Sequence, residues 1–203
     1  IIGSTNHKFK AGASFLYDRV DETFANQELD IIYRDTPVSS IRFDRREFVP
    51  GVFMEYNYDA GGKFSAIAGL RVDHHNLFGP LYTPRLHLRY NATETTTLRV
   101  SGGRGIRLAN LLTESTGVLA SARQFVFTGL QANYAYGYKP DMAWNYGVNL
   151  SQDFTLDYRP GSITVDYFYT DFENQVVLDM DYSAREARFF GLIGRSFSQS
   201  FQF

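Results

Sequence analysis

The sequence predicts an all-β fold, an antiparallel up-and-down transmembrane β-barrel with about eight strands in this chain. Apolar and polar residues alternate with a period of two in most segments, which is typical of strands that face two different environments. The connections between these segments are alternately short and long. Aromatic residues make up 16% of the chain, yet mean hydropathy is only −0.27, as expected when alternate residues face lipid.

The composition limits the class of protein. The chain has 203 residues, no cysteine and a formal charge of −2, which excludes a disulfide scaffold and gives no reason to expect nucleic acid. It contains no apolar run of about 18 residues, so no transmembrane helix is predicted. No secretion signal precedes the first strand, so an exported protein with this sequence is expected to be mature or a fragment.

The alternation defines each strand in order. In the first, Phe9, Ala11, Ala13 and Phe15 share one face, and lysine, glycine and serine occupy the other. The same pattern recurs along the chain, and most segments have the roughly 9–11 residues that a tilted strand needs to cross a bilayer. The predicted strands are 8–18, 49–58, 63–73, 83–90, 97–105, 143–152, 162–170 and 189–203.

The connections should sort onto two rims. Segments 59–62, 91–96 and 153–161 are short turns, whereas 18–46, 106–140 and 173–188 are long loops and 74–82 is intermediate. Short turns on one rim and long loops on the other are typical of bacterial outer-membrane barrels. We therefore expect the outer membrane as the location and outer-membrane lipid as a partner.

The period of two also assigns side chains to faces. Residues expected to face lipid are Phe64, Leu70, Leu86, Leu88, Tyr146, Val148, Val165 and Tyr167. Residues expected to face the lumen are Arg71, Arg85, His87, Arg89, Arg99 and Asn149.

Six segments resemble the barrel of TonB-dependent outer-membrane receptors, in particular Bacteroidetes receptors for ferric siderophores or cobalamin. They are FVPGVFMEYNY (48–58), AGLRVDHHNLFG (68–79), TPRLHLRYNATETTTLRVSGGRGIR (83–107), GGRGIRLANLLTESTGVLASARQ (102–124), KPDMAWNYGVNLSQDF (139–154) and ITVDYFYTDFENQVVLDMDY (163–182). The resemblance covers nearly the whole chain and implies a larger, plugged barrel of about 22 strands. Residues 1–203 would then be part of the β-barrel domain, about a third of it, with the plug domain and the remaining strands absent.

A complete small barrel of about eight strands, with a structural or adhesive role, is the alternative. It is favoured by the ending Phe201-Gln202-Phe203, since many outer-membrane proteins end on phenylalanine. It is disfavoured because Gln199 interrupts the apolar face. A soluble β-sandwich is a third possibility, although it would not require alternating connection lengths.

No catalytic motif is present, so the chain is not predicted to be an enzyme, and no cofactor is expected. Asp73, His74, His75 and Asn76 form the strongest metal-like cluster. Adjacent strand residues point to opposite faces, so the two histidines should not share an ion, and no metal site is predicted.

Ligand contacts are expected in the long loops, because binding residues concentrate in loops on a rigid scaffold. Arginine beside tyrosine suits an anionic, aromatic ligand, and the resemblance implies a ferric siderophore or a cobalamin-like molecule. The expected ligand-binding residues are Arg45, Arg46, Arg107, Arg123, Tyr134 and Tyr136. The lumen row Arg71, Arg85, His87, Arg89 and Arg99 is expected to contact a plug, or local acids, or a passing anion. The resemblance also implies the TonB complex as a partner, reached through the absent plug.

Overall fold

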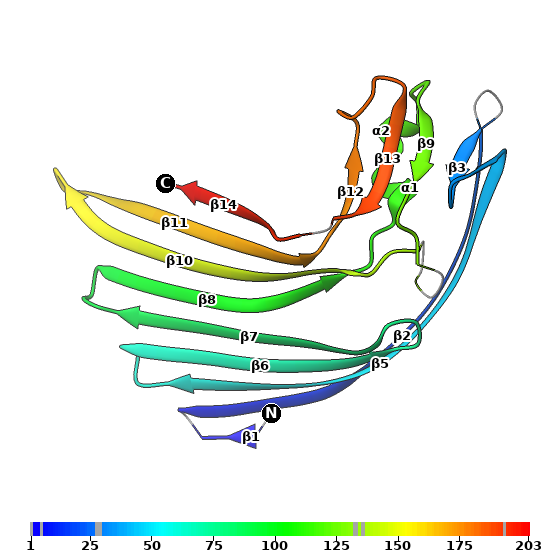
Figure 1. Ribbon diagram of the computed structural model, residues 1–203. Helices are drawn as coiled ribbons and strands as arrows, with labels where there is room; N and C mark the ends of the chain where they lie inside the picture. The colour runs from blue at the N-terminus through cyan, green and yellow to red at the C-terminus, as the bar shows by residue number, and fades with distance from the viewer. Residues whose placement is uncertain (1, 5, 27–29, 132–133, 135–136, 193) are drawn as a thin grey trace.

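The computed structural model describes residues 2–4, 6–26, 30–131, 134, 137–192 and 194–203. Within these residues the strands form two sheets (Figure 1). The larger sheet has nine strands in the order β1-β2-β5-β6-β7-β8-β10-β11-β14, and all its pairings are antiparallel. The smaller sheet, called the loop sheet below, has the order β12-β13-β9-β3-β4 and stands at one end of the larger one.

The larger sheet is a run of hairpins in chain order. Its strands are β1 (Ile2–Gly3), β2 (His7–Ala25), β5 (Ser40–Asp59), β6 (Phe64–His75), β7 (Gly79–Asn91), β8 (Thr96–Arg107), β10 (Asp141–Leu156), β11 (Arg159–Asn174) and β14 (Ser196–Gln202). The loop sheet and its short helices lie in the connections: β3 (Ile31–Tyr33), β4 (Thr36–Val38), α1 (Leu111–Glu114), α2 (Thr116–Leu119), β9 (Gln124–Phe127), β12 (Val176–Asp179) and β13 (Glu186–Gly191). None of the helices in the described part of the chain is long and apolar enough to cross a membrane.

The larger sheet is open. Its edges in the described residues are β1 and β14, and β2 pairs with β1 and β5 rather than with β14. The closure that a complete eight-stranded barrel requires is therefore not formed, whereas a segment of a larger barrel wall accounts for two free edges.

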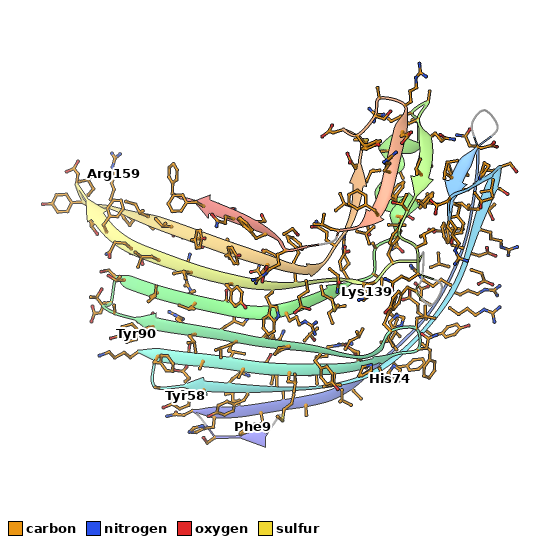
Figure 2. The ribbon with its side chains drawn as sticks, in the orientation of Figure 1. Phe9, Tyr58, His74, Tyr90, Lys139 and Arg159 are labelled. Atoms are coloured by element: carbon orange, nitrogen blue, oxygen red, sulfur yellow. The ribbon has the colours of Figure 1, made fainter. Side chains whose placement is uncertain are left out.

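The two-rim prediction is confirmed. The short turns after β5, β7 and β10 lie together at one end of the sheet, and the loop sheet lies at the other (Figure 1). Tyr58 and Tyr90 lie near the short-turn end and His74 lies near the loop end (Figure 2). The turn between β10 and β11 uses Asp157 and Tyr158, whose positive φ angles of 50° and 60° are those of a two-residue turn that suits the right-handed twist of paired strands.

The hairpin β2–β5 is longer than predicted. Residues 18–46 were expected to be a loop, but β2 continues to Ala25 and β5 already begins at Ser40. The apolar pattern reverses phase along β5: Val52 and Met54 face outward, whereas Ile41 and Phe43 are buried on the inner face. Such a reversal is expected where a strand extends beyond the lipid. Its outward face then meets water, and only its inner face contacts apolar residues, here those of the loop sheet.

The other long loops are also more ordered than predicted. Residues 106–140 contain β9 and both helices, and residues 173–188 contain β12 and the start of β13. The predicted strand 189–203 is wrong in its first part, because 186–191 belongs to β13 in the loop sheet and β14 begins only at Ser196. The expectation of antiparallel neighbours throughout also fails here, since β9 pairs in parallel with both β3 and β13.

The apolar core lies in the loop sheet rather than in the barrel wall. Phe125, Phe127, Phe189 and Ile31 are almost fully buried, and the rings of Phe127 and Phe189 stack 4.8 Å apart. Ile41 and Phe43 on the inner face of β5 join this cluster. The core therefore packs three connections against each other and against the loop end of β5.

Candidate functional site

The polar face of the larger sheet is the first part of the candidate site. Directly paired residues share a face, and the registers place Arg71, Arg85, His87, Arg89, Arg99 and Asn149 on one side. The predicted lipid-facing set lies on the other side. A cavity of about 740 Å³ lies against the polar face and is lined by Glu55, Arg85, Arg89, Arg99 and Asp166 among others.

Two of the lumen arginines are neutralised within the wall. Arg71 binds Asp73 through two hydrogen bonds, of 2.7 and 2.8 Å, and Arg85 forms an ion pair with Glu55. Lys10 also contacts Glu55, at 3.2 Å. Glycines make room for these pairs: a Cβ on Gly51 would lie 1.9 Å from an Asp73 oxygen, and one on Gly69 would lie 2.8 Å from Arg85 Nε.

The other two lumen arginines face each other without a carboxylate. Arg89 and Arg99 are direct cross-strand partners, and neither forms an ion pair with a described residue. Arg99 donates instead to Asn149 Oδ1 at 2.8 Å, and Arg89 donates to Asn91 Oδ1 at 3.2 Å. Because like charges placed opposite each other are unfavourable, this pair favours an anionic partner from outside the described wall.

A buried ionic cluster lies at the loop end of the wall. Arg45 Nε is 2.6 Å from Glu47 Oε1, and Arg45 Nη2 donates to Asn110 Oδ1 at 2.8 Å. His75 Nε2 is 3.7 Å from Glu47 Oε2, and its Nδ1 accepts the backbone N–H of Leu77 at 3.1 Å. The cluster joins β5 and β6 to the residue that precedes α1, and so fixes the start of the connection between β8 and β9 to the wall.

Burial, partly opposed by Glu47, lowers the pKa of His75 below its ordinary value of 6.5. His75 therefore binds a proton near pH 6.5 in the unfolded chain but only at lower pH in the folded one. The free energy of unfolding should be highest above pH 6.5 and should decrease below it. We expect the thermal midpoint of the full-length protein to drop on acidification through pH 6.5, and His75→Gln to flatten that dependence.

The matched control is His74→Gln, since His74 is exposed and points to the opposite face. Thermal unfolding followed by circular dichroism measures both variants. An acid dependence that survives His75→Gln unchanged would show that another group controls the mouth.

A second ionic cluster connects four elements at the mouth. Arg107, at the end of β8, donates to Asp141 Oδ2 at 2.7 Å and contacts Glu114 of α1 at 3.1 Å. Asp141, which begins β10, accepts the backbone N–H of Val176 in β12 at 2.8 Å. The Arg107 side chain is nevertheless 62% exposed, so its cation remains accessible from the mouth.

The remaining predicted ligand residues have different surroundings. Tyr134 stacks on Phe78, with ring centroids 5.6 Å apart, and Tyr136 lies outside the described residues. The guanidinium of Arg123 donates to the backbone oxygens of Met180, Ser183 and Glu186, which makes it a brace within the loop sheet. Arg46 is exposed on the outward face of β5, away from the mouth.

Sequence reasoning missed Asn110, Glu47 and Asp141 as members of the mouth clusters. Glu47 gave a signal, because it continues the alternation of 41–49 on the same face as Arg45. Asn110 and Asp141 gave none, since their partners are distant in the chain. In the described residues, no group of three or more histidine, cysteine, aspartate or glutamate side chains is arranged to hold a metal ion.

Residues 2–198 fit the family model described as TonB dependent receptor-like, beta-barrel. No curated protein sequence is significantly similar to the chain.

Solved structures of siderophore receptors resemble the fold. A ferric enterobactin receptor (PfeA) variant from Pseudomonas aeruginosa, in complex with enterobactin, has a TM-score of 0.64 at 16% identity over 98% of this chain and 31% of its own. The siderophore receptor PirA from Pseudomonas aeruginosa gives 0.60 at 14% identity, covering 98% of this chain and 33% of its own. PirA from Acinetobacter baumannii gives 0.58 at 13% identity, covering 98% and 32%. The chain thus spans about a third of the length of the structures it matches, and at these identities the likeness concerns the fold.

Proposed function

The chain belongs to the TonB-dependent receptor-like β-barrel family, a family of receptors and not of enzymes, and from this premise we propose that it forms part of the wall and mouth of an outer-membrane importer. The cargo proposed is a ferric siderophore or a similarly scarce nutrient. Residues 1–203 would form about a third of a barrel domain of about 22 strands, with a plug inside it.

The outward face of the wall supports a membrane location. Along β7, Tyr82 and Tyr90 bound a lipid-facing stretch containing Leu86 and Leu88, and the eight-residue interval spans about 26 Å along the strand. Aromatic residues recur at both levels on neighbouring strands, as in the pair Phe9–Tyr56 near the short turns. Two aromatic girdles around an apolar band are typical of outer-membrane barrels.

The observation that carries the proposal is the position of the loop sheet relative to the polar face. The inner face of β5 bears Glu55 beside the cavity and, further along, Ile41 and Phe43 in the core of the loop sheet. The ordered connections therefore lie over the loop end of the same face that lines the lumen. A receptor mouth needs this arrangement, because the ligand must pass from loops to lumen.

We assign ligand contact to Arg107, the exposed cation of the second ionic cluster, and to Tyr134, which stacks on Phe78, with Tyr136 retained from the sequence prediction. An exposed guanidinium and a tyrosine ring suit an anionic, aromatic ligand such as a ferric catecholate. Arg45 is buried and would act by positioning Asn110 and α1. Arg123 and Arg46 are not included, because one braces backbone oxygens and the other points outward.

We assign plug contact to the carboxylate-free pair Arg89 and Arg99, together with His87, which lies two residues before Arg89 on the same lumen face. Acidic side chains of a plug would neutralise this pair, and the plug would in turn carry the connection to the TonB complex. Arg71 and Arg85 are already paired within the wall, so they would contribute less.

The test uses the full-length receptor in cells that lack other siderophore receptors. Ferric enterobactin serves as the probe, and binding and uptake of radioactive iron are measured separately. Arg107→Ala should weaken binding about tenfold or more, because it removes a charge-assisted contact. Arg99→Glu should leave binding intact and reduce uptake, because it places a negative charge against the plug.

Arg159→Ala, at the short-turn rim, is the matched control and should change neither quantity. Absence of binding by the wild-type receptor to ferric catecholates would exclude that ligand class. Equal binding by the Arg107 variant would remove Arg107 from the site while leaving the receptor assignment intact.

A further inference from the structure

The outward face of the β2–β5 hairpin carries two arginines just beyond the aromatic girdle. Phe15, Tyr17 and Phe48 form the girdle here, and Phe15 and Phe48 meet edge to face at 4.9 Å. Arg19 follows Tyr17 by two residues and Arg46 precedes Phe48 by two, so each lies about 7 Å beyond the girdle along its strand. That distance places both guanidinium groups at the level of lipid headgroups.

The positive charges of these two arginines are only weakly balanced by nearby carboxylates. Arg19 and Arg46 are direct cross-strand partners, an arrangement that is unfavourable for like charges. The next outward pair is Asp21 opposite Asp44. Arg42 holds Asp21 through two hydrogen bonds of 2.9 and 2.6 Å, and Asp44 lies 3.9 Å from Arg46 across an exposed gap. Among the described residues Arg19 forms no hydrogen bond or ion pair, and it acts on Asp21 only through space.

The strands toward the other edge of the sheet, β8 to β14, provide an internal comparison. On the outward face there, Arg104 is the direct cross-strand partner of the girdle residue Trp144, and it pairs with Glu173, which also accepts the Trp144 indole N–H at 2.9 Å. Arg195 pairs with Asp171 at 2.9 Å. Both arginines there have close carboxylate partners, whereas on the β2–β5 hairpin Arg46 has only the 3.9 Å contact with Asp44. Arg19 has no carboxylate partner among the described residues, so this hairpin carries the weaker compensation of positive charge.

We propose that Arg19 and Arg46 form a binding site for a phosphate group on an anionic lipid of the outer leaflet. Two guanidinium forks side by side suit phosphate oxygens, which accept paired hydrogen bonds from arginine. The girdle below would pack against the acyl chains of the same lipid, so a lipid fits better than free phosphate. This inference rests on the membrane location in the proposed function but not on import. The lipid site can therefore be absent in a working receptor, and it can be present in a barrel that does not import the proposed ligand.

The experiment places the full-length receptor in phosphatidylcholine nanodiscs containing either bisphosphorylated lipid A or its dephosphorylated form. Native mass spectrometry measures the lipid that remains bound. The wild type should retain the phosphorylated form selectively, and Arg19→Gln combined with Arg46→Gln should weaken retention about 30-fold, from the contribution of two arginines at a membrane surface.

The matched control is Arg159→Gln combined with Arg195→Gln, which removes the same charge elsewhere on the surface and should leave retention unchanged. Thermal stabilisation of the wild type by phosphorylated over dephosphorylated lipid A gives a second readout that needs no variant. The proposal would be overturned by any of three results. The wild type could retain both lipids equally, the control could lose retention as much as the test variant, or inorganic phosphate could displace the lipid at an equal concentration.

Discussion

Replacing Leu86 with arginine should destabilise the folded barrel by about 2–4 kcal/mol, the cost of a cation on the lipid face near the middle of the bilayer. Leu86 lies midway between Tyr82 and Tyr90 on β7, and its cross-strand partners are the small residues Ala68 and Gly102. An arginine there would be about 13 Å along the strand from either girdle, so it could not easily carry its charge to the headgroups. Reversible folding of the intact receptor into lipid vesicles measures the difference.

The matched control is His87→Arg. His87 is the next residue but points into the lumen, so the same charge should cost far less there, the remaining cost being repulsion from Arg89 and Arg99. Similar costs at both positions, or a change below about half a kcal/mol for Leu86→Arg, would contradict the assignment of faces.

Replacing Phe127 with alanine should destabilise the loop sheet by about 3–5 kcal/mol, the usual cost of removing a large aromatic side chain from a core. Phe127 is fully buried, stacks on Phe189 and contacts Tyr33 and Phe43 through edge-on rings. Because β9 pairs with strands from two other connections, loss of this ring should loosen all three together. Hydrogen exchange of the full-length receptor should show faster exchange in β3, β9 and β13, with the barrel strands unchanged.

Met180→Ala is the control, because Met180 lies just after β12 and is 44% exposed. It should leave exchange in the loop sheet near the wild-type rate. Faster exchange confined to β9 in the Phe127 variant would contradict this expectation. It would mean that the three connections unfold independently and that the shared core does not hold them together.

Much of the wall could be predicted from the sequence because its two faces have different solvents. Each residue of a barrel strand faces either lipid or the lumen, so the chain records the strand, its register and its orientation in a local period of two. Arg85 and Leu86 illustrate this: neighbours in sequence, they lie on opposite faces as expected. The sorting of turns onto two rims followed from the same local pattern together with connection lengths.

The mouth could not be predicted in this way. Arg45, Asn110 and Asp141 meet partners up to 65 residues away, and nothing near them in the chain indicates those partners. The parallel pairing of β9 with β3 and β13 joins three separate connections, and a pairing of this kind leaves no signal in the period of any one segment.

The sequence by itself determined that this chain is a transmembrane wall with an apolar outer face and a polar inner one. The tertiary structure alone decided that the long connections form a second sheet, and that Arg107 lies at the mouth while Arg46 points outward. The physical reason is the surroundings of each strand. In the bilayer, lipid imposes one rule on every outward residue, whereas beyond the girdle a residue is buried only if another segment covers it, as the loop sheet covers Ile41 and Phe43.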